Sequence, residues 1–501
     1  MGNAPASTLS EIEWLFARDG TLTGKDAQGK WLLGNSLPMR TAKRMLRKLQ
    51  CAQSVACFLD VPHAAFLKEA LRKLNRNQGI VAVVPDAERL NQILHCENFS
   101  TEIGTRLWFA TGEDWDQSLA EIFQNHPGLS TPSTFIRTSF TDESALQTMI
   151  SRAQKVFAAE NARRGQIIQE NLRAGSKRTE RICLFAPSMF RLWDPAALVL
   201  SEMLPGVRFD PDQPVNSAPL GLSLAVRDCD AIVAANVAQA DAQGIVPEDK
   251  AWITWVTRPI IPAYTGAKRD SLLLADESWT QTARHAGWPE KQLAVAAWPQ
   301  IFSRATPSRG NYLTMISDTT TVAAEPDHFE LSSHALLWET IRQQLSKNPF
   351  DLREDPGQYL VRWLERCQVA RDGLDIKAFI EELIIPTYQQ SIVKLLSQNG
   401  LSVRCFGAGW EQIESCASHV GGKISDMDQM EEAVGGAAAL IHASPMTFAH
   451  PIEGMGRVVI STACSNEKAF IADALRAARG ELALPRSRGT SISAEMILAR
   501  I

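Results

Sequence analysis

Two polar segments in the last third of the chain carry residue types that bind nucleotides. Gly407-Ala-Gly409-Trp410 follows the apolar run 401–406; its glycines let a backbone approach a ligand closely, and its indole ring offers a face for a flat base or sugar. The second segment, 442–457, follows the apolar run 437–441 and suits a ribose and its phosphates. Its candidate binding residues are His442, Ser444, Thr447, His450, Glu453 and Arg457.

Each candidate has a chemical role and a structural alternative. The hydroxyls of Ser444 and Thr447, with the amides of a helix start, would hold phosphates, and Glu453 would accept two hydroxyl protons from a ribose. The alternatives are ordinary turn glycines at 407 and 409, a core tryptophan at 410 and a hydrogen-bonded structural histidine at 442. The order of the two segments, each after a strand, favours a common site.

Apolar periodicity predicts the elements that position these residues. Short strand-like runs alternate with helical patterns, which indicates an α/β fold with parallel sheets covered by helices on both faces. Ligands of such sheets bind at the carboxyl ends of the strands, where both segments lie. The expected strands are 55–60, 79–85, 106–110, 181–187, 231–235, 251–256, 271–275, 293–297, 311–316, 401–406, 437–441 and 457–460.

The length of 501 residues predicts several domains, because one hydrophobic core rarely exceeds about 300 residues. A polar, helix-favouring stretch at 144–181 marks the first boundary. The last strong helix, 467–479, should have Ser465 as its N-cap and Gly480 just past its end. The expected domains are 1–178, 179–305 and 306–501.

The first domain is expected to be an accessory Rossmann-like domain. Its run 81–86 resembles the second strand of a methyltransferase, which ends in an acidic residue that binds the cofactor ribose; here that residue is Asp86. The segment 57–63, however, has no glycine-rich turn. A backbone without glycines could not approach a nucleotide closely, so we expect no cofactor there.

Composition excludes several classes of protein. The 51 basic and 56 acidic residues give a formal charge of −5, which provides no overall field to attract nucleic acid. No apolar run of about 18 residues and no secretory signal pattern occur, so we expect a soluble, cytoplasmic protein without a membrane span. The nine cysteines form no C-x-x-C pair and the histidines lack zinc spacing, so we expect reduced thiols and no metal.

Residues 181–480 resemble glycosyltransferases of the GT-B fold, in particular bacterial enzymes of the spore-maturation and spore-coat type. The resemblance rests on G-L-S-V-R-C-F-G-A-G-W at 400–410 and A-A-L-I-H-A-S-P-M-T-F-A-H-P-I-E-G-M-G-R-V-V at 438–459. Upstream, the stretches 230–235, 252–258 and 275–289 are similar to the family's first Rossmann half.

The resemblance implies a GT-B-like pair of Rossmann-like domains behind the accessory domain. It implies transfer of a sugar from a nucleoside diphosphate of the UDP type to a protein or glycan acceptor, with no further cofactor. Glu453 matches the glutamate that binds the ribose, and His450 the histidine that precedes the family's arginine. Gly407, Gly409 and Trp410 match the strand end near the base, and 444–447 the loop near the donor phosphates.

The family also implies a metal-independent mechanism. Helix dipoles and basic side chains, here Arg304 and Arg457, would neutralise the leaving diphosphate. An inverting enzyme needs a base from its first Rossmann half, for which we expect Asp194, with Asp276 as the second choice.

The chain departs from the family's pattern at two places. The family's arginine is replaced around Pro451, and the turn 453–458 is shorter than in the family. Two alternatives therefore stay open beside the enzyme: a catalytically inactive binding or scaffold protein of the same fold, and a nucleotide-sugar epimerase of the GT-B fold.

Overall fold

The fold comes from a computed structural model of the chain, and by their contacts the residues group into two compact units. Unit 1 comprises Met1–Arg178, Phe209–Asp228 and Gly244–Pro247, and unit 2 comprises Thr179–Arg208, Cys229–Gln243 and Glu248–Ile501. The structure describes residues 12–47, 49, 54–74, 77–138, 142–174, 181–187, 196–257, 261–298, 310–322, 331–354, 356–424, 427–443, 458–462, 466–482 and 492–500.

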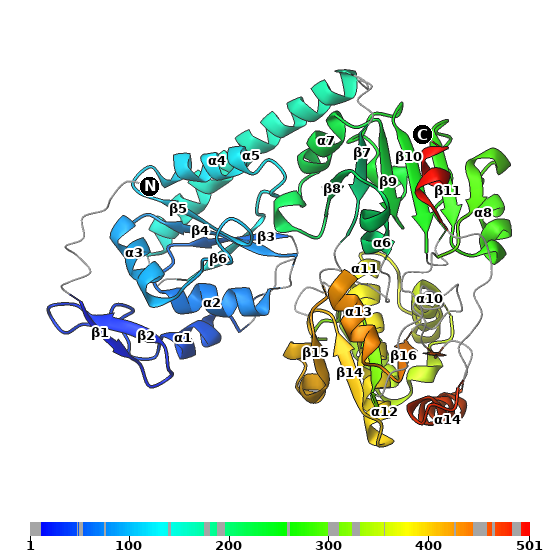
Figure 1. The fold of residues 1–501 in the computed structure, drawn as a ribbon. Helices are drawn as coiled ribbons and strands as arrows, with labels where there is room; N and C mark the ends of the chain where they lie inside the picture. Colours follow the sequence, from blue (N-terminus) through cyan, green and yellow to red (C-terminus); the bar gives the residue numbers. More distant parts are fainter. Residues whose placement is uncertain are drawn as a thin grey trace. The chain divides into compact units, whose positions relative to one another are not determined.

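Unit 1 contains a four-stranded parallel sheet in the order β5-β4-β3-β6 (Figure 1). Every residue of β3 and β4 is buried, as expected of apolar strands that helices cover on both faces. The three strands predicted here are confirmed, and β6 is an additional edge strand. The bounds are β3 Val55–Leu59, β4 Gly79–Val84, β5 Leu107–Thr111, β6 Thr134–Arg137, α2 Ala64–Lys73, α3 Ala87–Cys96 and α4 Trp115–Asn125.

A hairpin and a long helix complete unit 1. The antiparallel hairpin pairs β1 (Glu13–Phe16) with β2 (Leu22–Lys25) and precedes α1 (Pro38–Met45). The polar stretch predicted to be helical forms α5, Glu143–Ala174, of 32 residues. The Phe209–Asp228 segment packs on this helix through α7 (Pro219–Arg227), and Asn171 Nδ2 donates to Ser223 Oγ at 3.0 Å.

Asp86 caps a helix in this unit. Its carboxylate Oδ1 accepts from the backbone N–H groups of Glu88 and Arg89 at the start of α3, at 2.9 and 3.4 Å. These are two of the N–H groups that a helix start leaves without an internal partner. Asp86, which by its position resembles a ribose-binding residue, therefore binds backbone N–H groups of its own helix instead.

Unit 2 begins with a six-stranded sheet in the order β12-β11-β10-β9-β7-β8. The pairs from β7 through β9, β10 and β11 to β12 are parallel, which confirms the predicted α/β character of this region. The bounds are β7 Ile182–Phe185, α6 Ala196–Met203, β8 Val207–Phe209, β9 Ala231–Ala235, β10 Ala251–Val256, β11 Asp270–Leu274, α8 Thr280–His285 and β12 Leu293–Val295.

The last sheet has five parallel strands in the order β15-β14-β13-β16-β17. Its largest hydrophobic core packs β13 and β14 against helices α9, α10 and α12. The bounds are β13 Leu313–Ile316, α9 Ser332–Lys347, α10 Pro356–Cys367, α11 Ile376–Ala378, a π-helix Phe379–Ile384, α12 Ile385–Gln398, β14 Val403–Phe406, β15 Val420–Gly422, α13 Met427–Gly435, β16 Ala439–His442, β17 Val459–Ser461 and α14 Glu467–Ala478.

One predicted helix end is wrong and the other is confirmed. The N-cap of α14 is Asn466, whose side chain accepts from the Ala469 N–H at 3.0 Å, so the predicted cap at Ser465 is one residue too early. Ser465 itself lies outside the described residues. Gly480 follows the helix with φ +72°, the left-handed conformation that glycine adopts at no steric cost.

Residues 492–500 pack on the six-stranded sheet, which we call the middle sheet. The N–H of Ile492 donates to the Ala297 carbonyl at 2.6 Å, and Arg500 donates to the carbonyls of Lys291 and Leu293. Ile492 and Ile497, the latter in α15 (Ala494–Leu498), belong to the hydrophobic core of that sheet. The chain therefore passes from the middle sheet to the last sheet and then returns. None of the helices in the described ranges is long and apolar enough to cross a bilayer.

A carboxyl group in the middle sheet predicts a pH dependence of stability. Asp270 begins β11, it is buried, and its Oδ1 has no hydrogen-bond partner within the described residues. Burial raises the pKa of this carboxyl to about 7. The unfolded carboxyl ionises near pH 4, so the folded state loses stability as the pH rises from about 4 to 7 and keeps that loss above pH 7.

Asp270→Asn should therefore be more stable than the wild type at pH 8, by on the order of 2 kcal/mol after screening by solvent, and nearly equal to it at pH 4. Urea denaturation at pH 4, 6 and 8 measures the difference. The exposed Asp372 provides the control, because Asp372→Asn should leave the pH profile unchanged. A gain from Asp270→Asn that is the same at all three pH values would contradict the assignment.

Candidate functional site

The topology of the last sheet marks a place for a ligand. The chain moves from β13 to β14 on one side and later returns to β16 on the other side of β13, so the strand order reverses between β13 and β16. In open α/β sheets, ligands bind outside the carboxyl ends of the strands at such a reversal. Ser317 directly follows β13, and His442 ends β16. The predicted segment 442–457 therefore begins at this position.

Hydrogen bonds join the segment after β13 to the segment after β14. The Ala408 N–H donates to Asp318 Oδ1 at 2.6 Å, and the Thr319 N–H donates back to the Ala408 carbonyl at 2.9 Å. Trp410 Nε1 donates to the Ser317 carbonyl at 2.6 Å. We call residues 317–319 and 407–410 together the paired loops.

The glycines of the paired loops are needed for this contact. Gly407 and Gly409 have φ values of +132° and +91°, which residues with a Cβ rarely adopt. A Cβ at Gly407 would overlap the Ser317 carbonyl, and one at Gly409 would overlap the Thr319 carbonyl. The close approach that their type predicts is therefore made to the protein's own backbone.

Trp410 is a core residue. Its side chain is 0% exposed, and it belongs to the same hydrophobic core as β13 and β14. The predicted stacking of its ring on a base or sugar does not fit this geometry, since no face of the indole is open. The structural alternative describes Trp410 correctly.

His442 is also buried, with a side chain that is 0% exposed. Its backbone carbonyl accepts from the N–H and from the hydroxyl of Thr462, at 3.2 and 3.3 Å, which ties the end of β16 to the residue after β17. Tyr388 of α12 donates to the same Thr462 hydroxyl at 2.5 Å. Burial raises the pKa of the Tyr388 phenol, which keeps it a neutral donor.

Several polar groups near these strand ends did not enter the sequence prediction. The Ser317 hydroxyl is buried, and it has no hydrogen-bond partner among the described residues. The same holds for Thr387 Oγ1 and Gln389 Oε1 in α12, just after the π-helix. Buried polar atoms without partners are rare and cost roughly 1–3 kcal/mol each.

The side chain of Gln390 joins α12 to the segment that follows β13. Gln390 Nε2 donates to Thr319 Oγ1 at 3.1 Å and to the Thr320 carbonyl at 2.9 Å. The sequence does carry a signal for this region, because a polar run directly follows the apolar strand 311–316. This run contains neither glycine nor an aromatic residue, the two residue types that marked the segment at 407–410.

Asp276 is the one remaining predicted site residue that lies within the described part of the chain. Asp276 follows β11, and its carbonyl accepts from the Trp279 N–H at 3.2 Å, so it starts a 3-10 turn. Within the ranges that the structure describes, no group of three or more His, Cys, Asp or Glu side chains could hold a metal ion. Outside the described residues lie Asp194, Arg304, Ser444, Thr447, His450, Pro451, Glu453 and Arg457.

The close contact at Gly409 predicts a loss of stability on substitution. Gly400 also has a positive φ, +73°, but a Cβ there would meet no atom within 4 Å. Gly400→Ala should therefore cost about 1–2 kcal/mol from backbone strain alone. Gly409→Ala carries the same strain plus the overlap with Thr319, and should cost at least about 1–3 kcal/mol more. Chemical denaturation of both variants tests this, and equal losses would show that the loops are not in contact.

Comparison with known proteins identifies no relative. No protein-family model matches the chain, and neither a curated protein nor a solved structure matches it.

Proposed function

We propose that the protein is a glycosyltransferase that moves a sugar from a nucleoside diphosphate, of the UDP type, to a protein or glycan acceptor without a bound metal. The observation that carries the proposal is the path of the chain through unit 2. Two separate Rossmann-like sheets follow one another, and the end of the chain returns from the second sheet to the core of the first. This connectivity supports the GT-B-like pairing that the sequence resemblance implies.

The donor would bind at the reversal between β13 and β16. Ser317 has a buried hydroxyl there that has no partner in the described part of the chain, and a donor oxygen would reach it only once the atoms that cover it move aside. The hydroxyl-, histidine- and carboxylate-bearing segment 442–457 begins at the same strand end. By its match to the family motif, Glu453 would bind the ribose, and Ser444 and Thr447 would lie by the phosphates.

The acceptor would be activated from the middle sheet. A sugar transfer with inversion needs a base that removes the proton of the acceptor hydroxyl as the new glycosidic bond forms. Asp194 keeps this role in the proposal, with Asp276, after β11, as the second choice. The leaving diphosphate would be stabilised by backbone amides and by Arg304 and Arg457, whose individual loss should cost about 10²–10³ in rate.

A catalytically inactive binding protein of the same fold is the second candidate. It is favoured by the burial of Trp410 and by the use of Gly407 and Gly409 for contact between loops. Both features remove residues that the enzymatic interpretation had assigned to the donor base. Such a protein could keep the fold and bind a partner without transferring a sugar.

A thermal-denaturation panel of UDP-, GDP-, TDP- and CMP-sugars tests the proposal. One of these donors, at 100 times its dissociation constant, should stabilise the protein by about 2.7 kcal/mol. Glu453→Ala should lose most of this effect, whereas the exposed Glu411→Ala should keep it. Absence of any shift in the wild type would remove the enzymatic proposal, and an equal shift in Glu453→Ala would show that the ribose residue is misassigned.

Ser317→Ala separates a binding residue from a purely structural one. Removal of a buried hydroxyl that has no partner should leave the free protein as stable as the wild type or more stable by up to about 1 kcal/mol. The same change should lower the affinity for the nucleotide-sugar donor roughly tenfold, since one hydrogen bond to the ligand is lost. Denaturation with and without the donor measures both effects. Unchanged donor affinity would place the ligand away from the end of β13.

A further inference from the structure

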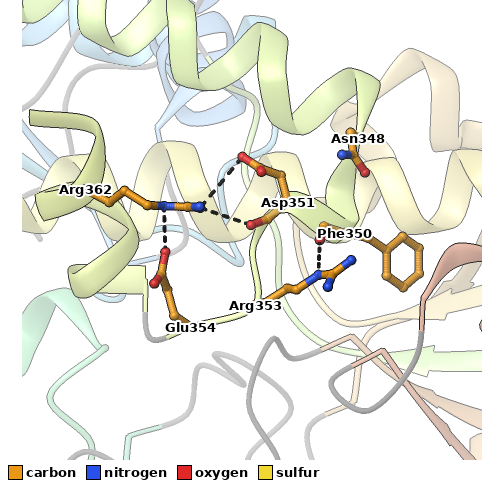
Figure 2. A pocket seen from close by; sticks show the side chains of 6 residues that line it. All are labelled: Asn348, Phe350, Asp351, Arg353, Glu354 and Arg362. Carbon is orange, nitrogen blue, oxygen red and sulfur yellow. Dashed lines mark hydrogen bonds and ion pairs between the residues drawn. The ribbon is translucent and has the colours of Figure 1, made fainter. Parts of the chain in front are cut away.

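A polar pocket lies between the end of α9 and the start of α10 (Figure 2). Its volume is about 330 Å³, near the lower end for small-molecule sites. None of its lining residues follows a strand, so it is separate from the candidate site at β13 and β16. The residues that line it are Asn348, Phe350, Asp351, Arg353, Glu354 and Arg362.

The charges on one side of the pocket are paired. Arg362 Nε forms an ion pair with Glu354 Oε1 at 2.9 Å, and its Nη2 donates to the Asp351 carbonyl at 3.1 Å (Figure 2). Arg362 Nη2 also lies 3.8 Å from Asp351 Oδ2, and the Tyr359 hydroxyl donates to the same carboxylate at 3.1 Å. Arg362 is therefore occupied by two acidic side chains and is not available to a ligand.

Arg353 is held in place but keeps most of its donors. Its Nε donates to the Phe350 carbonyl at 2.9 Å, as Figure 2 shows, and Phe350 is itself fixed in the core against Phe470. The two terminal nitrogens of Arg353 have no acceptor among the described residues, and Arg353 forms no ion pair there. A guanidinium carries five N–H donors, and because Arg353 is exposed, the other four face solvent and are open to a ligand.

A second donor lines the same pocket. Asn348, at the end of α9, is exposed as well, and its side-chain amide makes no hydrogen bond within the described ranges, so it faces solvent at the pocket. A guanidinium that is fixed through Nε presents its terminal nitrogens in the planar arrangement that matches the oxygens of a carboxylate or phosphate. Because one contact already orients Arg353, less side-chain freedom is lost when such a group binds.

We propose that this pocket binds an oxyanion, the phosphate or carboxylate group of a small ligand, with Arg353 as the main donor and Asn348 as a second one. The site goes beyond the proposed sugar transfer and does not depend on it. Asp351 and Glu354 line the same pocket, and their pairing with Arg362 limits their repulsion of an anion.

Thermal denaturation of the full chain in sodium phosphate, sodium acetate and sodium chloride of equal ionic strength tests the proposal. A saturable rise of about 2–4 °C over chloride is expected with phosphate or with acetate. Phosphate alone would indicate a phosphate-bearing ligand, and acetate alone a carboxylate. No rise with either anion would overturn the proposal.

Variants locate the effect. Arg353→Gln should lower the affinity for the anion that stabilises the wild type by at least tenfold. Arg353→Lys should lower this affinity less, since lysine keeps the charge without the planar arrangement. Arg366→Gln is the matched control, because Arg366 lies on α10 over the Trp363 ring and does not line the pocket. A rise that is equal in Arg353→Gln and the wild type would overturn the proposal, and it would leave the nucleotide-sugar prediction untouched.

Discussion

The contact between the paired loops is the constraint on which the carboxyl edge of the last sheet depends. Three hydrogen bonds hold residues 317–319 against 407–410, through Asp318, the backbone of Ala408 and the indole of Trp410. The contact requires glycine at 407 and 409, places Trp410 in the core and fixes Ser317 at the strand end. The residue types at 407–410 thus serve a contact within the protein, and the proposed function places the donor at the reversal between β13 and β16 instead.

Most of the fold could be predicted from the sequence, because parallel strands buried on both faces give continuous apolar runs. β9 and β10 are entirely buried and have the bounds that their apolar runs predict. The strand β6 was missed since its residues are only partly buried or exposed, and its sequence T-F-I-R has no such run. The short hairpin strands β1 and β2 gave too little periodicity to be recognised.

The position of Gly407, Gly409 and Trp410 after a strand could be predicted from the sequence, but their surroundings could not. Gly407, Gly409 and Trp410 do follow a strand at the expected edge, but a residue's type cannot show whether a ligand or a neighbouring loop occupies the space beside it. Ser317 was missed because a single serine after a strand is an ordinary feature of sequences. It becomes a candidate only when its burial and the lack of a partner in the described residues are known.

A crystal structure of the protein with UDP tests the central claim most directly. Our account predicts the diphosphate at the carboxyl ends of β13 and β16, with an oxygen within hydrogen-bond distance of Ser317 Oγ and the paired loops unchanged. UDP bound at another part of the chain, or a nucleotide base stacked on a displaced Trp410, would contradict it.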